Sequence, residues 1–91
     1  MDNNWVVYGL VCARKKDFVA YIGITNNFEA RFLAHKNGKG AKFTKSFKPV
    51  YGAVLERGLS RFEAARKEHI YKKLPSATKL ALIHSNLENP L

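Results

Sequence analysis

Cysteine is nearly absent from this chain of 91 residues, in which Cys12 is the only one. A single thiol excludes a disulfide framework and a cysteine-rich zinc module. Long hydrophobic runs are absent too, since none approaches the roughly 18 residues that cross a bilayer, so we expect no membrane partner. Residues 1–5 carry no basic segment before an apolar run, which predicts no secretory signal and an intracellular protein, cytoplasmic or nuclear.

Acidic residues are scarce as well: seven Asp and Glu face 16 Lys and Arg, which gives a net charge of +9. Such an excess on a small domain indicates a polyanionic partner, most often nucleic acid. A basic protein without such a partner is the alternative, and an anionic membrane surface is less favoured because no long basic amphipathic helix is present. The 46% hydrophobic content is typical of one globular domain, whose modest core leaves little room for a large substrate pocket.

The chain alternates between two kinds of segment. Stretches rich in β-branched and aromatic residues predict three strands, at Trp5–Cys12, Phe18–Ile24 and Pro49–Glu56. Capping signals predict three helices, at Phe28–Lys36, from a capping box at Ser60 to about Leu74, and at Ser76–His84. The charged turn at residues 13–17 favours an antiparallel hairpin, and residues 36–48 are expected to form a loop. The order predicts an α+β domain over residues 1–84, with a small sheet covered by helices, and a tail over residues 85–91.

Two tyrosines lie in the first two predicted strands, Tyr8 and Tyr21. An antiparallel hairpin places alternate residues on one face, so the two phenols could converge there. The alternative is that both are ordinary sheet aromatics with satisfied hydroxyl groups.

Arg31 and His35 are four residues apart in the first predicted helix, so they project from the same face. The pair is not a stabilising ion pair, but it suits a forked phosphate contact beside an acid, a base or a second phosphate contact. An ordinary solvated helix face is the alternative.

Glu68 shares a helix face with Ala64, Ala65 and Lys72. Two alanines would let that helix approach the sheet closely, and a carboxylate there needs a lysine or a hard metal ion as its partner. An exposed Glu68–Lys72 pair of little energetic weight is the alternative. Because the seven acids form no cluster, the sequence favours one Mg²⁺ held by one carboxylate and waters.

The expected loop carries a lysine at every third position, with two phenylalanines between them: Lys36, Lys39, Lys42, Lys45 and Lys48, with Phe43 and Phe47. Lysines neutralise phosphates and aromatic rings stack on unpaired bases, which predicts a nucleic-acid contact. The alternative is a solvated loop whose phenylalanines fill the core.

These motifs occur in an order that resembles the GIY-YIG endonuclease superfamily, and within it the small single-domain YhbQ-like group. The ordered set is Val6-Val7-Tyr8, Tyr21-Ile22-Gly23, Arg31, His35 and Glu68. Connecting phrases of the same group stand at residues 38–44, 63–68 and 79–83. Each motif alone is weak, but together they extend from Trp5 to Ile83.

The resemblance implies a three-stranded antiparallel sheet flanked by helices and metal-dependent cleavage of DNA phosphodiesters. Tyr8 or Tyr21, more often the first, would deprotonate or orient the attacking water. Arg31 would stabilise charge on phosphorus, and His35 would assist the nucleophile or contact phosphate. Glu68 would be the single protein ligand of Mg²⁺, with Mn²⁺ as an alternative.

Further residues match positions that the group shares. Gly23 would leave room near the scissile phosphate. Substrate contact or support is implied for Lys42, Thr44 and Lys72, and the lysine spacing adds Lys39. Two departures are visible: Val6 replaces the first motif's glycine, and the segment between the tyrosines is a residue or two longer, which adds cations without moving the site.

The leading hypothesis is a DNA endonuclease that nicks with low sequence specificity, on structured or single-stranded DNA, in repair, recombination, or viral genome processing or defence. The first alternative is a non-catalytic nucleic-acid-binding domain of this fold. The carboxylate of Glu68 argues against it, because a carboxylate weakens phosphate binding unless a metal lies between them. The second alternative is a subunit that is active only with a protein partner supplying specificity.

Overall fold

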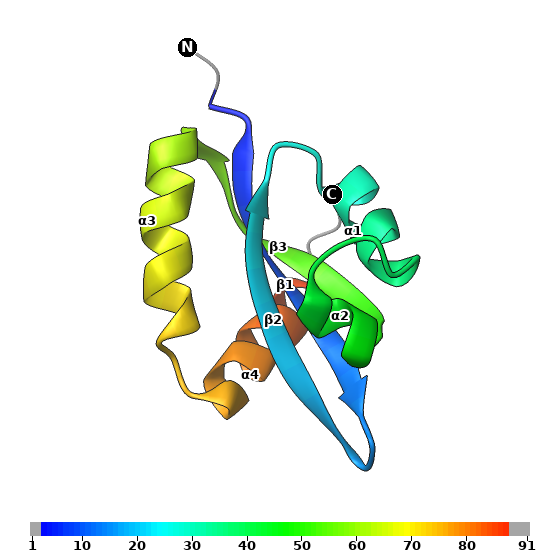
Figure 1. Cartoon of the computed structure of the whole chain (residues 1–91). Helices are drawn as coiled ribbons and strands as arrows, with labels where there is room; N and C mark the ends of the chain where they lie inside the picture. Colours follow the sequence, from blue (N-terminus) through cyan, green and yellow to red (C-terminus); the bar gives the residue numbers. More distant parts are fainter. Residues whose placement is uncertain (1–2, 88–91) are drawn as a thin grey trace.

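Three strands form one antiparallel sheet in the spatial order β2-β1-β3 (Figure 1). The computed structural model describes residues 3–87. The elements in chain order are β1 (Trp5–Arg14), β2 (Asp17–Thr25), α1 (Phe28–Lys36), α2 (Lys42–Ser46), β3 (Pro49–Leu59), α3 (Arg61–Lys72) and α4 (Ser76–Asn86). The predicted α+β architecture is confirmed.

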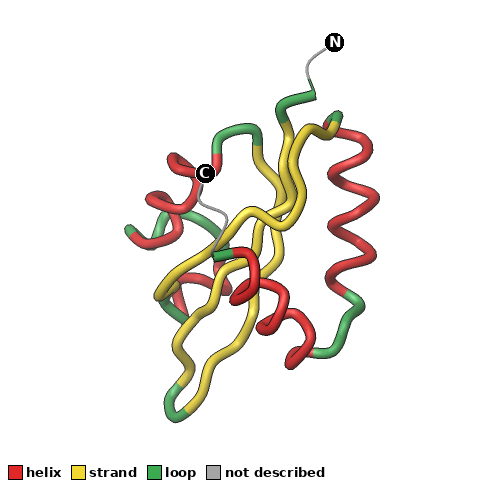
Figure 2. Tube along the Cα trace, turned by 180° about the vertical axis from the view of Figure 1, so that it is seen from behind, coloured by secondary structure: helices red, strands yellow, loops and turns green. Residues whose placement is uncertain are grey.

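Helices cover both faces of the sheet, because side chains of β1 alternate between them. Val7 packs with Ala64 of α3, and Val11 packs with Ile83 of α4. On the other face of the sheet, Tyr8 and Leu10 pack against phenylalanines of α1 and α2. Figure 1 shows α3 and the α1–α2 pair on opposite sides of the strands. Figure 2, the view from behind, shows α4 lying across the sheet.

The β1–β2 hairpin is longer than the sequence predicted. Its pairing continues to Arg14 opposite Asp17, so the turn is confined to residues 15–16, where Lys15 has a φ of 40°. Arg14 closes the hairpin with two hydrogen bonds of 2.8 and 2.9 Å to the Asp17 carboxylate. Residues 13–18 are all exposed, and this tip projects beyond the helices (Figure 1).

The expectation of a loop over residues 36–48 is wrong in its centre, where α2 forms. Phe43 and Phe47 are one helical turn apart and pack together, with ring centroids separated by 5.1 Å. Both rings also pack on the core cluster that contains Tyr8. Burial of this apolar face stabilises a helix of only five residues, too short to be stable through its own propensity.

Helix α3 begins where the sequence predicted, but the predicted capping role of Ser76 is wrong, because Ser76 is the first residue of α4 and Pro75 is its N-cap. The capping box forms, with Ser60 N donating to Glu63 Oε1 at 2.9 Å and Glu63 N donating to Ser60 Oγ at 3.1 Å. Helix α3 ends two residues before the predicted Leu74, and α4 continues two residues beyond His84. The predicted tail therefore loses residues 85–86 to α4, and residues 88–91 lie outside the described part. No helix within residues 3–87 is long and apolar enough to cross a membrane.

Candidate active site

The phenol of Tyr8 lies at the centre of the candidate site. Tyr8 stands in the middle of β1 with only 1% of its surface exposed, directly opposite Gly23 of β2. A Cβ atom on Gly23 would overlap the Tyr8 hydroxyl. The room that this glycine leaves, which the resemblance assigned to the scissile phosphate, is therefore filled by the phenol itself.

His35 is the hydrogen-bond partner of that phenol. Its Nε2 lies 2.7 Å from Tyr8 Oη, and its Nδ1 lies 2.8 Å from Thr44 Oγ1 of α2. The imidazole is fully buried, so the alternative of a solvated helix face is wrong for His35. Thr44 is 1% exposed, so of the two roles implied for it, the geometry favours support of His35 over contact with substrate.

Burial sets the acidity of both groups. It raises the pKa of Tyr8 to about 12, against an opposing interaction with the Arg31 guanidinium; the charges of Tyr21 and Glu68 raise it further. Burial also lowers the pKa of His35, with the Arg31 charge as the second cause. Residues from β2, α1 and α3 thus influence the acidity of one phenol.

The second tyrosine, Tyr21, packs beside the rings of Tyr8 and His35. Tyr21 of β2 is partly buried, with its ring centroid 6.4 Å from that of Tyr8 and 5.2 Å from that of His35. The rings of the two tyrosines therefore lie close together on one face of the sheet, as predicted. Phe43 of α2 packs on the other side of Tyr21, with centroids 5.6 Å apart.

Arg31 is available for an anion. It lies one helical turn before His35 on α1 and is half-buried. Within residues 3–87, no carboxylate forms an ion pair with its guanidinium. A guanidinium without a carboxylate partner suits a forked contact with phosphate.

Glu68 presents its carboxylate from α3. One turn earlier, Ala64 is fully buried against the sheet, whereas Ala65 is exposed, so one alanine rather than two provides the close approach. The Glu68–Lys72 pair, which was the alternative to a metal site, is present, with Lys72 Nζ 3.4 Å from Glu68 Oε2. This surface contact is weak, and the carboxylate is 24% exposed.

For a hard divalent cation, the site offers one carboxylate, that of Glu68. In the described part of the chain, no three His, Cys, Asp or Glu side chains gather as a metal site. One partly open carboxylate, whose charge acts on Tyr8, suits a Mg²⁺ ion that keeps most of its waters.

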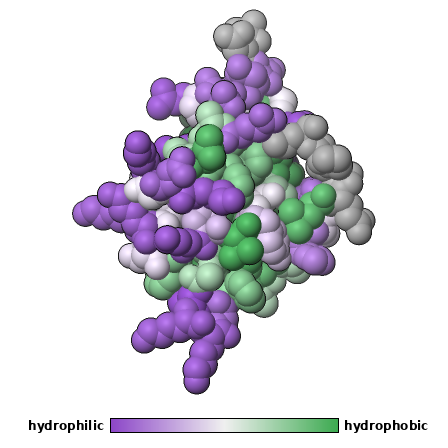
Figure 3. Space-filling view, turned by 90° about the vertical axis from the view of Figure 1, so that its right-hand side faces the viewer, coloured by the Kyte–Doolittle hydropathy of each residue, from purple (hydrophilic) through white to green (hydrophobic). Residues whose placement is uncertain are grey.

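The lysines of the segment between α1 and β3 point outward. Lys39, Lys42 and the other three are all exposed, and no acidic residue occurs between Glu29 and Glu56. Figure 3 looks onto the α1–α2 side and shows hydrophilic side chains projecting from it and from the hairpin end below. The phenylalanines of this segment fill the core, which was the alternative to base stacking.

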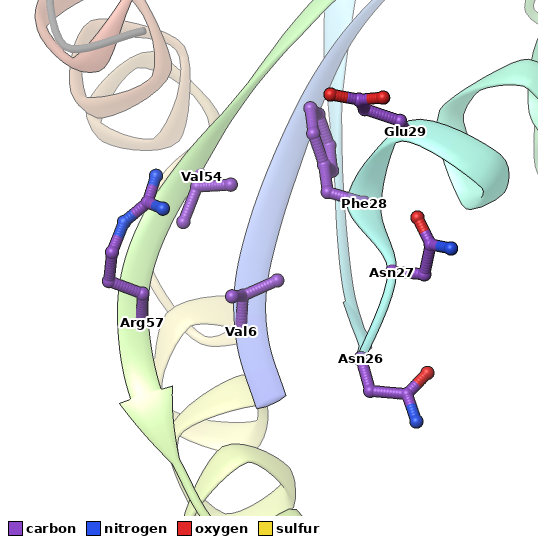
Figure 4. Close-up of a pocket in the computed structure, with 7 residues that line it drawn as sticks. All are labelled: Val6, Asn26, Asn27, Phe28, Glu29, Val54 and Arg57. Atoms are coloured by element: carbon purple, nitrogen blue, oxygen red, sulfur yellow. The ribbon is translucent and has the colours of Figure 1, made fainter. Parts of the chain in front are cut away.

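A cavity of about 210 Å³, which was not predicted, borders the Tyr8 cluster through Phe28. It opens between β1, β3 and the start of α1, and its lining residues are Val6, Asn26, Asn27, Phe28, Glu29, Val54 and Arg57 (Figure 4). Val6, which replaces the first motif's glycine, forms part of its wall. None of the predicted site residues lines it.

The lowered pKa of His35 predicts a stability change with pH. The unfolded histidine binds a proton near its ordinary pKa of about 6.5, whereas the buried one resists protonation until lower pH. The free energy of unfolding should therefore fall as the pH is lowered from 7 to 5.5, by at most about 1.4 kcal/mol per pH unit. Urea denaturation at several pH values measures this, and His35→Gln should remove this component. An unchanged pH dependence in His35→Gln would contradict it.

Comparison with known proteins is consistent with this geometry. The family model described as the GIY-YIG catalytic domain matches residues 4–81. A UPF0213 protein of Neisseria meningitidis serogroup C is 40% identical over 80 residues, which cover 88% of this chain and 85% of the relative. A UPF0213 protein of Oceanobacillus iheyensis is 39% identical over 83 residues, or 91% of this chain and 93% of the relative.

A UPF0213 protein of Clostridium perfringens is 44% identical over 79 residues, which cover 87% of this chain and 82% of the relative. No solved structure gives a significant match. The family model extends over the sheet, the buried tyrosine and the helix that bears Glu68. This chain belongs to the GIY-YIG family.

Proposed function

We propose that this protein is a metal-dependent DNA endonuclease that nicks with low sequence specificity. One observation carries the proposal: the buried Tyr8 phenol is hydrogen-bonded to His35 within electrostatic reach of Arg31 and Glu68. A phosphodiester needs a nucleophile, a charge sink and a stabilised leaving oxygen, and these side chains can serve each need.

The nucleophile is a water molecule that loses its proton to Tyr8. With a pKa of about 12, the phenol is neutral at physiological pH, so it cannot act as a standing phenolate. It passes its own proton to His35 Nε2, 2.7 Å away, as it takes one from the water. The water oxygen bonds to phosphorus, the bond to the leaving sugar oxygen breaks, and that oxygen gains a proton from solvent.

Charge that develops on the phosphate is stabilised by Arg31. Its guanidinium has no competing carboxylate within residues 3–87. Loss of one such donor costs about 10²–10³ in rate. Glu68 would hold Mg²⁺, or Mn²⁺ as an alternative, and the ion when bound would supply positive charge that stabilises the leaving group.

DNA binds along the lysine-bearing side of the molecule. Six cations and no acids occur between Glu29 and Glu56, on and around α1 and α2. The backbone N–H of Ala13 in the hairpin donates to Lys48 O at 2.9 Å, which joins this segment to the base of the basic hairpin tip. Charge contacts of this kind act on phosphates and carry no sequence information, in agreement with low specificity.

A second function is favoured by one observation on α3. Phe62 is 77% exposed and Ile70 is 55% exposed on that helix, an unusual amount of free apolar surface on so small a domain. Such residues suit a subunit that is active only with a protein partner supplying specificity. Weak cleavage by the isolated chain would favour this alternative.

Glu68→Gln should abolish cleavage and leave DNA affinity equal or tighter, because it removes the metal ligand and a negative charge near the phosphate. Nicking of supercoiled plasmid and of a branched oligonucleotide, with Mg²⁺ and with chelator, measures the first effect. Fluorescence anisotropy with labelled DNA measures the second. Glu29→Gln, on the exposed first turn of α1, is the matched control and should cleave normally.

Two results would contradict this account in different ways. Normal cleavage by Glu68→Gln would remove the metal assignment. DNA binding without cleavage by the unaltered protein, in both Mg²⁺ and Mn²⁺, would instead indicate a binding domain or a partner-dependent subunit.

Neutralising Lys39, Lys42 or Lys45 to Gln should flatten the salt dependence of DNA binding. Each lost phosphate contact lowers the slope of log K against log salt by about one. Titrations at several NaCl concentrations measure the slope. Lys79→Gln on α4, which covers the opposite face of the sheet, is the control and should keep the original slope. Equal slopes for all four variants would show that DNA does not follow the α1–α2 side.

A further inference from the structure

We propose that Thr44 is a positioning residue that holds the proton of His35 on Nδ1 and so keeps Nε2 free to accept the proton of Tyr8. The inference rests on the proposed function and adds to it a residue that does not touch the reacting atoms. It arises from a chain of three hydrogen bonds that links β1, α1 and α2.

The direction of these hydrogen bonds follows from counting protons. Thr44 Oγ1 donates its single hydroxyl proton to the carbonyl oxygen of Ala41 at 3.0 Å, an oxygen that also accepts from the backbone N–H groups of Thr44 and Lys45. Toward His35 Nδ1, at 2.8 Å, the same oxygen must therefore act as acceptor. A neutral imidazole carries one N–H, so this proton is on Nδ1 and Nε2 bears a lone pair.

The remaining bond is then fixed as well. With a lone pair on Nε2, the 2.7 Å contact requires Tyr8 Oη to be the donor. Every proton in the chain thus points the same way, from Tyr8 through His35 and Thr44 to the carbonyl of Ala41. This is the arrangement in which His35 can take the Tyr8 proton without first turning or exchanging its own.

Burial leaves His35 no other partner for Nδ1. The imidazole is fully buried and Thr44 is 1% exposed, so water has no access to either group. A Cβ atom on Gly40 would overlap the His35 ring, so the chain before α2 lies flat against it. Phe43 and Phe47, packed on the Tyr8 cluster, hold α2 and its threonine in place.

The arrangement also tolerates the protonated state. When His35 gains a proton on Nε2, its Nδ1–H still donates to Thr44 and the new N–H faces the Tyr8 oxygen. Only the bond between Tyr8 and His35 changes its donor, and the bonds from His35 to Thr44 and from Thr44 to Ala41 keep their direction, as expected of a preorganised proton acceptor. Valine in place of Thr44 would keep the shape of the side chain and remove the acceptor.

Thr44→Val should lower the single-turnover cleavage rate about 10- to 100-fold, the usual cost of losing an orienting partner of this kind, with DNA affinity unchanged. Thr44→Ser retains the hydroxyl and should restore most of the rate. Thr78→Val, at an exposed position of α4, is the matched control and should cleave normally.

The tautomer itself is measured by two-dimensional ¹H–¹⁵N NMR of the histidine side chains, which needs neither DNA nor activity. His35 should carry its proton on Nδ1 in the unaltered protein and in Thr44→Ser, and Thr44→Val should shift it partly or wholly to Nε2. A proton on Nε2 of His35 in the unaltered protein would overturn the inference. So would a Thr44→Val variant that keeps both the Nδ1–H form and the full rate.

These outcomes separate the inference from the proposed function. If the unaltered protein does not cleave DNA but has the Nδ1–H tautomer and loses it in Thr44→Val, the proposed function fails and the positioning role of Thr44 stands. If Thr44→Val does not fold, the spectra of the unaltered protein and of Thr44→Ser still decide the tautomer.

Discussion

The buried hydrogen bond between Tyr8 Oη and His35 Nε2, 2.7 Å long, is the interaction on which the rest of the site depends. A buried phenol and a buried imidazole each need a partner, and an unpaired polar group at this depth destabilises a fold. The bond joins the central strand to α1, and both neighbouring glycines make space for it: Gly23 beside the phenol and Gly40 beside the imidazole. The geometry of the candidate site and the packing of this side of the sheet therefore depend on the same bond.

Around that bond the charges are unevenly distributed, and the imbalance suits a polyanionic substrate. The segment between Glu29 and Glu56 contains cations and no acids, and within residues 3–87 Glu68 is the one carboxylate whose charge acts on the Tyr8 phenol. One carboxylate among many cations repels DNA little by itself, and it provides the oxygen ligand that a divalent cation prefers. The chain has few acidic residues, which excluded a cluster of metal ligands in the sequence. This scarcity fits a site with a single protein ligand.

The parts of the fold governed by local signals could be predicted from the sequence. The capping box at Ser60 and the helical spacing of Arg31 and His35 depend only on near neighbours. Helix α2 was missed because its stability comes from phenylalanines that pack on distant strands, not from its own five residues. The bond between His35 and Thr44 was missed because α2 places them together. Tyr8, 27 residues from His35 along the chain, was singled out with Tyr21 from strand alternation, but its catalytic role came from the family's motif order.

The most direct test of the account is the single-turnover rate of DNA cleavage by Tyr8→Phe, measured beside its DNA affinity. Phenylalanine keeps the ring that packs against the core and removes only the hydroxyl that bridges water and His35. If the phenol transfers the proton, the rate should fall by about 10²–10⁴ while DNA affinity stays unchanged. A Tyr8→Phe protein that cleaves at the original rate would contradict the account, because the Tyr8–His35 bond would then be structural and the nucleophile would be activated elsewhere.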